Sequence, residues 1–255
     1  MQGIKNVSGV MILSELKHGM PIAVMDGTVL TSIRTAAVGA CAVKHLARKN
    51  TETIGFIGAG IEARMHLDLI MTVTPNLKKC YVSSRTSITV DTFIKEEKSK
   101  HPQLEFIACG NDFRASVIDG DIVITATSTQ EALLKAKWIK KGTTYVHVGG
   151  WEDEFEVPKL ADKIICDRWD CVKHRGQTIC RMYKAGLLKD EDIYADFDEI
   201  VNGSKPSREN DDEFIYFNSV GLAFIDVYFA NYIYLNVQNG TMNAKMEKIA
   251  DYIEF

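Results

Sequence analysis

A glycine-rich turn between a short apolar segment and a helical one constrains this chain more than any other feature. Thr53–Ile57 has the β-branched, apolar character of a buried strand, and a helical pattern begins near Glu62. Between them, Gly58, Gly60 and Ala63 give the spacing G-x-G-x-x-A. The first glycine permits a tight turn, the second lets backbone approach a pyrophosphate, and the alanine lets the helix pack closely on the strand. The positive end of that helix then faces the phosphate charge. The turn predicts a dinucleotide site that includes Gly58, Ala59, Gly60 and Ile61.

Apolar runs and helical stretches alternate after this turn. Lys79–Ser83 is typical of a strand and Val90–Ser99 of a helix. Four further strands are predicted at Leu104–Ala108, Asp121–Ala126, Thr143–Val148 and Lys163–Cys166. Strands separated by helices indicate an α/β fold with a parallel sheet. We therefore predict a Rossmann-type, doubly wound parallel sheet over residues 34–166.

The segments on either side of this sheet have a different character. Short strand-like runs at Ser8–Leu13 and Pro21–Met25 precede a helix that starts near Ile33. Phe214–Leu235 is long enough to span a membrane, but it contains Asp226 and four tyrosines, so we interpret it as a buried strand, turn and helix. Residues 1–33 and 167–255 are expected to form together a second, smaller α+β domain for substrate binding and dimerisation.

The end of the second strand bears on the choice of coenzyme. NAD sites commonly place Asp or Glu there, where the carboxylate accepts hydrogen bonds from the ribose. This chain has Ser84, Arg85 and Thr86 instead. A guanidinium binds a 2′-phosphate bidentately, and hydroxyl groups donate to it. The pattern favours NADP(H), and NAD(H) is the alternative coenzyme. The structural alternative for Arg85 is a solvated surface residue that does not bind a coenzyme.

Charge and cysteine content exclude several other classes. The 30 basic and 34 acidic residues give a net charge of -4, which offers no basic surplus for nucleic acid. Six cysteines are too few for a disulfide scaffold, and reduced thiols in a cytoplasmic protein are expected. Cys166, Cys171, His174 and Cys180 fit no common four-ligand zinc spacing, so no metal site is predicted.

Several motifs together resemble the ornithine cyclodeaminase/mu-crystallin family over nearly the whole chain. They are Ser8–Leu13, Pro21–Asp26, the LTSIRTAA motif at Leu30–Ala37, the glycine turn, and Arg208–Asp226 with FNSVGLAFID. The resemblance implies an NAD(P)-dependent enzyme that acts at an amino-acid C–N bond. The family's opening segment, with a substrate-contacting lysine and arginine, is expected to be missing before Met1, which puts turnover in doubt.

The resemblance also implies roles for individual residues. Arg34 corresponds to the arginine that holds the substrate α-carboxylate. Cofactor contacts are implied for Thr35, Thr125, Thr127, His147, Val148, Gly149, Ser219 and Gly221. For Thr125, Thr127 and Ser219, hydrogen bonding at strand ends and turns is the structural alternative.

An acid is expected just after the paired glycines Gly149 and Gly150, where this chain has Trp151. Glu152 or Asp153 would then take the substrate proton, and we favour Glu152. An acidic turn in solvent is the structural alternative.

The predicted reaction is hydride transfer at an amino-acid Cα–N bond, of the ornithine cyclodeaminase type, yielding proline and ammonia from ornithine. Alternatives are an NADPH-dependent ketimine reductase, an alanine dehydrogenase and a diaminopropionate-releasing dehydrogenase. A catalytically silent, crystallin-like NADPH-binding protein is the alternative from another class. The apolar stretch from Gly221 to Leu235 suggests a homodimer.

Overall fold

The computed structural model describes residues 8–243, which fall into two compact units. The larger, here the sheet unit, runs from Ser32 to Leu222. The smaller, here the hairpin unit, combines the chain up to Thr31 with the chain from Ala223 onward. The two ends of the sequence therefore contribute to one unit, and the middle forms the other.

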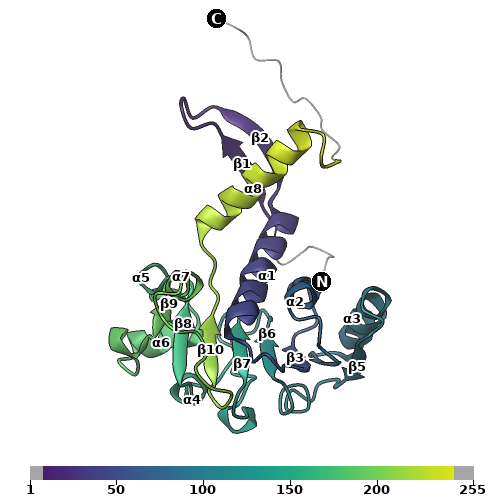
Figure 1. Ribbon diagram of the computed structural model, residues 1–255, viewed down its shortest axis with the longest axis vertical. Coiled ribbons are helices and arrows are strands. Elements are labelled where there is room, and N and C mark those ends of the chain that lie inside the picture. The colour runs from purple at the N-terminus through teal and green to yellow at the C-terminus, as the bar shows by residue number, and fades with distance from the viewer. Residues whose placement is uncertain (1–7, 244–255) are drawn as a thin grey trace, which may run out of the picture. The chain divides into compact units, whose positions relative to one another are not determined.

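The sheet unit contains an eight-stranded sheet in which every pair of neighbouring strands is parallel (Figure 1). Its strand order is β5-β4-β3-β6-β7-β10-β8-β9. This is the Rossmann-like α/β fold that the alternating pattern predicts. The strands are β3 (Thr53–Ile57), β4 (Lys79–Ser83), β5 (Glu105–Ala108), β6 (Ile122–Thr125), β7 (Thr144–His147), β8 (Lys163–Cys166), β9 (Ala195–Asp196) and β10 (Ile215–Asn218).

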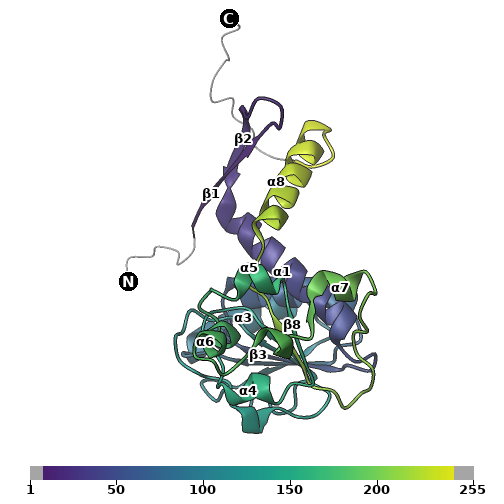
Figure 2. The ribbon, with the colours of Figure 1, turned by 90° about the vertical axis from the view of Figure 1, so that its left-hand side faces the viewer.

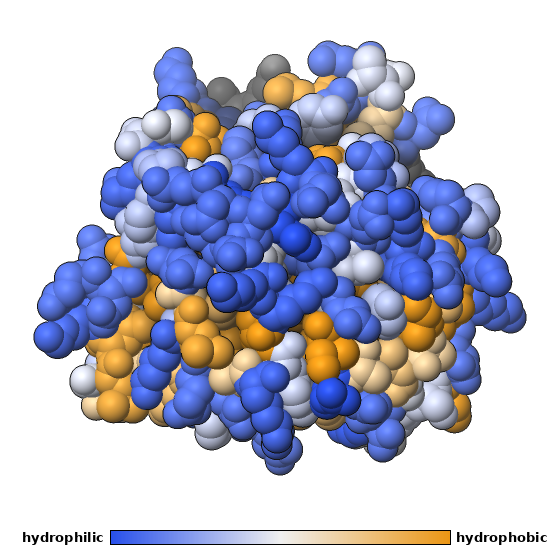
Figure 3. All heavy atoms as spheres, turned by 60° about the horizontal axis from the view of Figure 1, so that its bottom comes forward, coloured by the Kyte–Doolittle hydropathy of each residue, from blue (hydrophilic) through white to orange (hydrophobic). Residues whose placement is uncertain are grey.

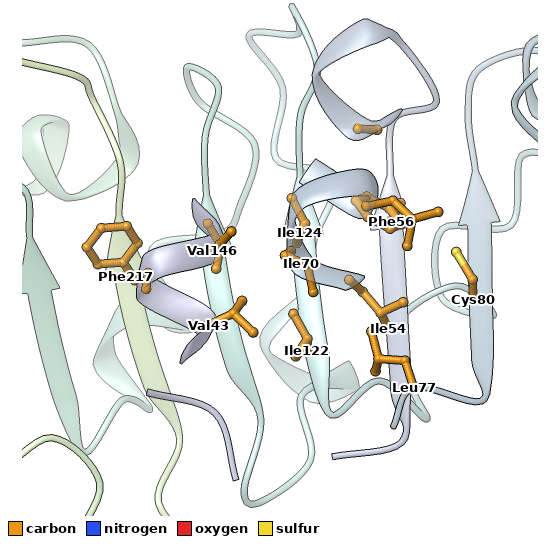
Figure 4. Close-up of a cluster of buried hydrophobic side chains, with 14 of the residues drawn as sticks. Val43, Ile54, Phe56, Ile70, Leu77, Cys80, Ile122, Ile124, Val146 and Phe217 are labelled. Atoms are coloured by element: carbon orange, nitrogen blue, oxygen red, sulfur yellow. The ribbon is translucent and has the colours of Figure 1, made fainter. Parts of the chain in front are cut away.

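Apolar residues cover both faces of this sheet, because successive strand side chains point to opposite sides. On β6, Ile122 and Ile124 join one buried cluster and Val123 joins another. Figure 4 shows part of the first cluster, with Ile122 and Ile124 beside Ile70. That cluster lies against α1 (Gly27–Leu46), α2 (Ile61–Val73), α3 (Ser87–Lys100) and α7 (Phe197–Val201). The second lies against α4 (Glu156–Lys159), α5 (Trp169–Val172) and α6 (Thr178–Lys184), and two short 3-10 helices, η1 (Ala136–Trp138) and η2 (Asp190–Asp192), complete the helices of this unit.

The last strand in the sequence occupies a central position in the sheet. β10 lies between β7 and β8, with Phe217 opposite Val146 on one side and Ile165 on the other. The sheet unit therefore extends to Leu222, beyond the domain boundary expected at residue 166, because β9 and β10 belong to the same sheet.

The hairpin unit pairs two antiparallel strands and packs one helix on them. These elements are β1 (Val10–Ser14), β2 (Pro21–Asp26) and α8 (Ala223–Gln238). Figures 1 and 2 both show α8 beside the hairpin, and its small core is Leu13, Leu30 and Ala230. Ala230 is the one buried residue of α8, so the expectation of a buried strand, turn and helix holds for β10 and not for this helix. α1 begins at Gly27, upstream of the expected start at Ile33, although Gly27, Thr28 and Val29 have low intrinsic helix propensity.

Within residues 8–243, no helix combines the length and apolar character that crossing a bilayer requires. Hydrophilic side chains cover most of the face shown in Figure 3, and apolar side chains appear among them.

Candidate functional site

The turn after β3 has a backbone conformation that only glycine adopts readily. Gly58 has a φ of 107°, and a Cβ at this position would lie 2.4 Å from the carbonyl oxygen of Ala126. Its N–H donates to the carbonyl of Ser83 at 2.9 Å. The turn therefore packs between the end of β4 and the residue that follows β6. These contacts fix the direction in which α2 starts.

Open space lies directly over the first turn of α2. Gly60 is the N-cap of this 13-residue helix, and no atom lies within 4 Å of a Cβ built there. Three residues later, the side chain of Ala63 is fully buried against the sheet. The free N–H groups of a helix start attract anions, and the open space lets a diphosphate reach them. The residues present therefore fit the dinucleotide that the glycine spacing predicts.

The end of β4 presents cationic and hydroxyl groups. The Ser83 hydroxyl turns inward and donates to the carbonyl of Phe56 at 3.1 Å. Ser84 is half-buried and Arg85 is exposed. Thr86 is the N-cap of α3, so another helix start faces this position. The stretch from Ser83 to Thr86 contains no carboxylate that would repel a phosphate.

Arg34, on α1, lies among groups from three other segments of the sheet unit. A Cβ on Gly221, whose φ is 93°, would lie 2.2 Å from one Arg34 nitrogen. Asp167, directly after β8, accepts the N–H groups of Val220 and Gly221, each at 2.6 Å. Burial raises the pKa of Asp167 to about 6, while those two hydrogen bonds and the Arg34 charge lower it. Burial also raises the pKa of Glu62, against a hydrogen bond from Ser32 and the same Arg34 charge.

The carboxylate of Glu152 connects the loops that follow β6 and β7. It is fully buried and accepts hydrogen bonds from the Gly149 N–H at 2.8 Å and the Thr125 hydroxyl at 2.8 Å. The Thr127 hydroxyl donates to it at 2.6 Å, and the Thr127 N–H donates as well. Four donors on one carboxylate fix the two loops against each other.

Asp153 and His147 form a second buried polar group below the same loops. His147 Nε2 lies 3.6 Å from an oxygen of Asp153 and 3.6 Å from one of Glu152. Burial raises the pKa of Asp153 to about 6, against the lowering effects of His147 and of hydrogen bonds from Thr178 and Tyr216. Its second oxygen, Oδ2, is buried and has no hydrogen-bond partner among residues 8–243. Both acids are therefore interior groups, and the alternative of an acidic turn in solvent is wrong.

The sheet unit gathers the predicted residues near the carboxyl ends of its strands, at two depths. Exposed or half-buried are Arg34, Thr35, Gly60, Ile61, Ser84, Arg85, Thr86, Thr127, Val148, Gly149 and Gly221. Buried are Gly58, Ala59, Thr125, His147, Glu152, Asp153 and Ser219. The Thr125 hydroxyl bonds Glu152 and the Tyr145 hydroxyl, which is the structural alternative that the sequence left open for it.

Sequence reasoning missed Asp167 and Tyr216. Asp167 directly follows the strand Lys163–Cys166, so its place at a strand end was a usable signal. Tyr216 was hidden inside an apolar run, and no local pattern distinguishes it from a core tyrosine.

Comparisons with known proteins agree with this geometry. The ornithine cyclodeaminase/mu-crystallin family matches residues 1–241. The chain is 31% identical to N-((2S)-2-amino-2-carboxyethyl)-L-glutamate dehydrogenase of Staphylococcus aureus, covering 93% of this chain and 70% of that protein. The structure of Thermococcus litoralis Δ1-pyrroline-2-carboxylate reductase, in complex with NADH and L-proline, matches with a TM-score of 0.89 and 30% identity, over 96% of this chain and 76% of that one. An archaeal alanine dehydrogenase dimer with bound NAD matches with a TM-score of 0.86 and 30% identity, over the same shares of 96% and 76%.

Proposed function

This chain belongs to the ornithine cyclodeaminase/mu-crystallin family, and from that membership we propose that it is an NAD(P)-dependent oxidoreductase acting at the Cα–N bond of an amino acid or its imine. One observation carries the proposal. An open helix start at Gly60 and the guanidinium of Arg34 belong to the same sheet unit, and Glu62 of that helix interacts with Arg34. A site for a diphosphate and a site for a carboxylate are therefore adjacent.

A nicotinamide coenzyme held at the start of α2 would supply the hydride chemistry of the proposed reaction. The chain supplies binding and orientation. Gly58 and Gly60 let the backbone approach the diphosphate, and the start of α2 stabilises its charge. Arg34 holds the α-carboxylate through a planar fork that fixes the orientation of Cα.

The two predicted acids take different parts in this proposal. Glu152 already accepts four hydrogen bonds, so we assign it to positioning the loops after β6 and β7. Asp153 has an oxygen with no hydrogen-bond partner among the described residues and a pKa raised by burial to about 6, so it can hold a proton closer to neutral pH than an ordinary aspartate, and we assign it to proton transfer. The geometry favours Asp153 over Glu152, the reverse of the order in the sequence analysis.

Several specific reactions share this hydride step. They are ornithine cyclodeamination, ketimine reduction, alanine dehydrogenation and release of diaminopropionate. A panel supplies each substrate with the coenzyme form that its reaction needs. Alanine and an N-substituted amino acid are tested with NAD+ and NADP+, and a cyclic ketimine with NADH and NADPH, through the absorbance of the reduced coenzyme. Ornithine is tested with NAD+ and NADP+ through the release of ammonia, because cyclodeamination returns the coenzyme to its starting state. We expect turnover of at least one member, and its loss in Arg34→Gln. Failure of wild-type protein to bind either coenzyme in a fluorescence titration contradicts the proposal, and binding without turnover of any member favours the silent binding protein.

For the coenzyme, we propose a preference for NADP(H), supported by Arg85 and the start of α3. Arg85→Gln should weaken NADPH binding on the order of 10- to 100-fold, because a charge-assisted bidentate contact is lost, and should change NADH binding little. Lys98→Gln, which removes one charge from the other end of α3, is the matched control. Equal weakening of both coenzymes in Arg85→Gln would contradict the preference.

We also propose that the hairpin unit mediates a homodimer. Phe224, Val227 and Tyr228 of α8 are 68%, 51% and 66% exposed, an apolar surface that a second copy would cover. The archaeal alanine dehydrogenase of similar structure is a dimer, which supports this proposal.

A further inference from the structure

A group of cations in the last turn of α6 and in the loop before this helix has no acidic partners among the described residues. It comprises Arg175, Arg181 and Lys184, here called the basic strip. Within residues 8–243, no carboxylate lies within ion-pair distance of any of the three, whereas nearby Lys173 pairs with Asp170 at 2.8 Å. The protein carries a net charge of -4, so such unpaired cations do not follow from a general surplus of basic residues. The three unpaired cations indicate an anion-binding site.

The guanidinium of Arg181 is held in position by three neutral contacts. It stacks over the ring of Trp151, 4.9 Å from the centroid. Its Nε donates to the carbonyl of Gly176 at 2.8 Å, and one terminal nitrogen, Nη2, donates to the Gln130 amide oxygen at 2.7 Å. The other terminal nitrogen, Nη1, has no hydrogen-bond partner in the part of the chain that the structure describes. A fixed fork with a free donor loses little conformational entropy when it binds a carboxylate.

The contacts of Arg181 place it beside the loops that the proposed function uses. Trp151 follows Gly149 and Gly150 after β7, and Gln130 belongs to the loop after β6. A Cβ on Gly150 would lie 2.7 Å from the Gln130 amide nitrogen, so these two loops pack closely. The Lys184 ammonium donates to the carbonyls of His174 and Arg175 at 2.9 and 2.8 Å. These two hydrogen bonds hold the loop before α6 against the end of this helix.

We propose that Arg181, supported by Arg175 and Lys184, binds a second carboxylate of the substrate, distinct from the α-carboxylate assigned to Arg34. This inference rests on the proposed function and narrows its substrate class. The preferred substrates are amino acids or imines with at least two carboxylates. Monocarboxylic substrates of the same length provide no second anion to pair with the Arg181 guanidinium, so they bind more weakly.

Glutamate and glutamine test this inference, because they match in size and differ by one charge. Their binding to the full chain is measured by calorimetry, with and without saturating coenzyme. Wild-type protein should bind glutamate on the order of 10- to 100-fold more tightly than glutamine, as expected for a charge-assisted hydrogen bond to a carboxylate. Arg181→Gln should weaken glutamate binding by that factor and leave glutamine and coenzyme binding unchanged. Arg181→Lys should restore part of the preference, because it keeps the charge without the fork.

Two further variants keep the test decisive. Arg175→Gln changes an exposed side chain with no hydrogen bond of its own, and it should reduce the preference for glutamate without affecting folding. Lys159→Gln removes a charge from α4, which packs on the same side of the sheet, and should have no effect. Equal binding of glutamate and glutamine by wild-type protein would overturn the inference.

The remaining outcomes separate this inference from its rivals and from the proposed function. Loss of coenzyme binding in Arg181→Gln, with the glutamate preference intact, would show that the arginine contacts the coenzyme diphosphate and would also overturn the inference. A glutamate preference that depends on Arg181, in a protein that binds no coenzyme, would uphold the inference and contradict the proposed function.

Discussion

The sheet unit and the hairpin unit bury their apolar residues to different degrees. In the sheet unit, strands such as β6, β7 and β10 are buried along their whole length, with apolar clusters on both faces. In the hairpin unit, alternate residues of β1 and β2 face α8, and the others face outward. Ile12 and Val24 are direct partners across the hairpin and are 59% and 52% exposed. A two-stranded sheet with one covered face is marginal by itself.

This difference distinguishes a core that helices enclose on both faces of a sheet from one that is covered on a single face. The sheet unit buries the apolar side chains of its central strands on both faces. The hairpin unit is rich in apolar residues, as a protein interior is, but many of these side chains are exposed to solvent. Its outward apolar face fits an interface better than it fits solvent.

We expect the largest effect from Val24→Glu, which should weaken self-association through the hairpin unit. A charge on the outward face of the hairpin would be buried in a symmetric interface twice, so we expect self-association to weaken at least ~100-fold. Light scattering over a concentration series measures the change. Val201→Glu is the matched control, because Val201 is a 48% exposed apolar residue of the sheet unit. Dimerisation that survives Val24→Glu would show that the outward face is not the interface.

Substitutions at two glycines of the sheet unit test whether its stability and its coenzyme affinity depend on different residues. Gly58→Ala should lower the free energy of unfolding by about 1–3 kcal/mol, because its positive φ and the Ala126 carbonyl both oppose a Cβ. Gly60→Ala places its methyl group in open space, so the stability should change by less than about 0.5 kcal/mol.

The same Gly60→Ala variant should nevertheless weaken coenzyme binding on the order of 10-fold, because its methyl group occupies space assigned to the diphosphate. Urea unfolding and fluorescence titration give the two quantities. Unchanged coenzyme affinity in Gly60→Ala would argue against a diphosphate at the start of α2.

The buried acids predict a smaller, pH-dependent difference between the units. Burial raises the pKa of Asp167 from 3.8 to about 6, so between these values the folded state binds more protons than the unfolded state. Its contribution to stability is therefore present below pH ~4 and is lost as the pH rises to about 6. Asp167→Asn should flatten this decline by up to about 1.4 kcal/mol per pH unit.

Denaturant unfolding at several pH values, compared with Asp170→Asn on the exposed start of α5, measures this effect. Among the described residues, the hairpin unit has no buried acid, and the pKa of its Glu15 is lowered rather than raised, so a decline in stability with rising pH should follow the sheet unit. A slope that Asp167→Asn leaves unchanged would contradict the assignment to this carboxyl group.

Local patterns predicted most of the sheet and only part of the site. The strand Lys163–Cys166 and the turn at Gly58 were predicted at their observed positions, because each depends on neighbours in sequence. The place of β10 between β7 and β8 depends on pairing with strands far away in the chain, and periodicity carries no information about it. The sequence left open whether Glu152 and Asp153 lie in the interior or in a solvent-exposed turn, for a similar reason. Their partners are Thr125 at the end of β6, Thr127 in the loop after it, and Thr178 on α6.

The central position of β10 has a consequence for the order in which the protein is assembled. Until residue 218 has left the ribosome, β7 and β8 have no strand between them, and each presents an unpaired edge. The nascent chain must therefore keep a gap open in the middle of its sheet while more than two hundred residues are already synthesised. Co-translational folding can complete the β5-β4-β3-β6-β7 half early, but closure waits for β10, which follows every other strand of this sheet in the chain.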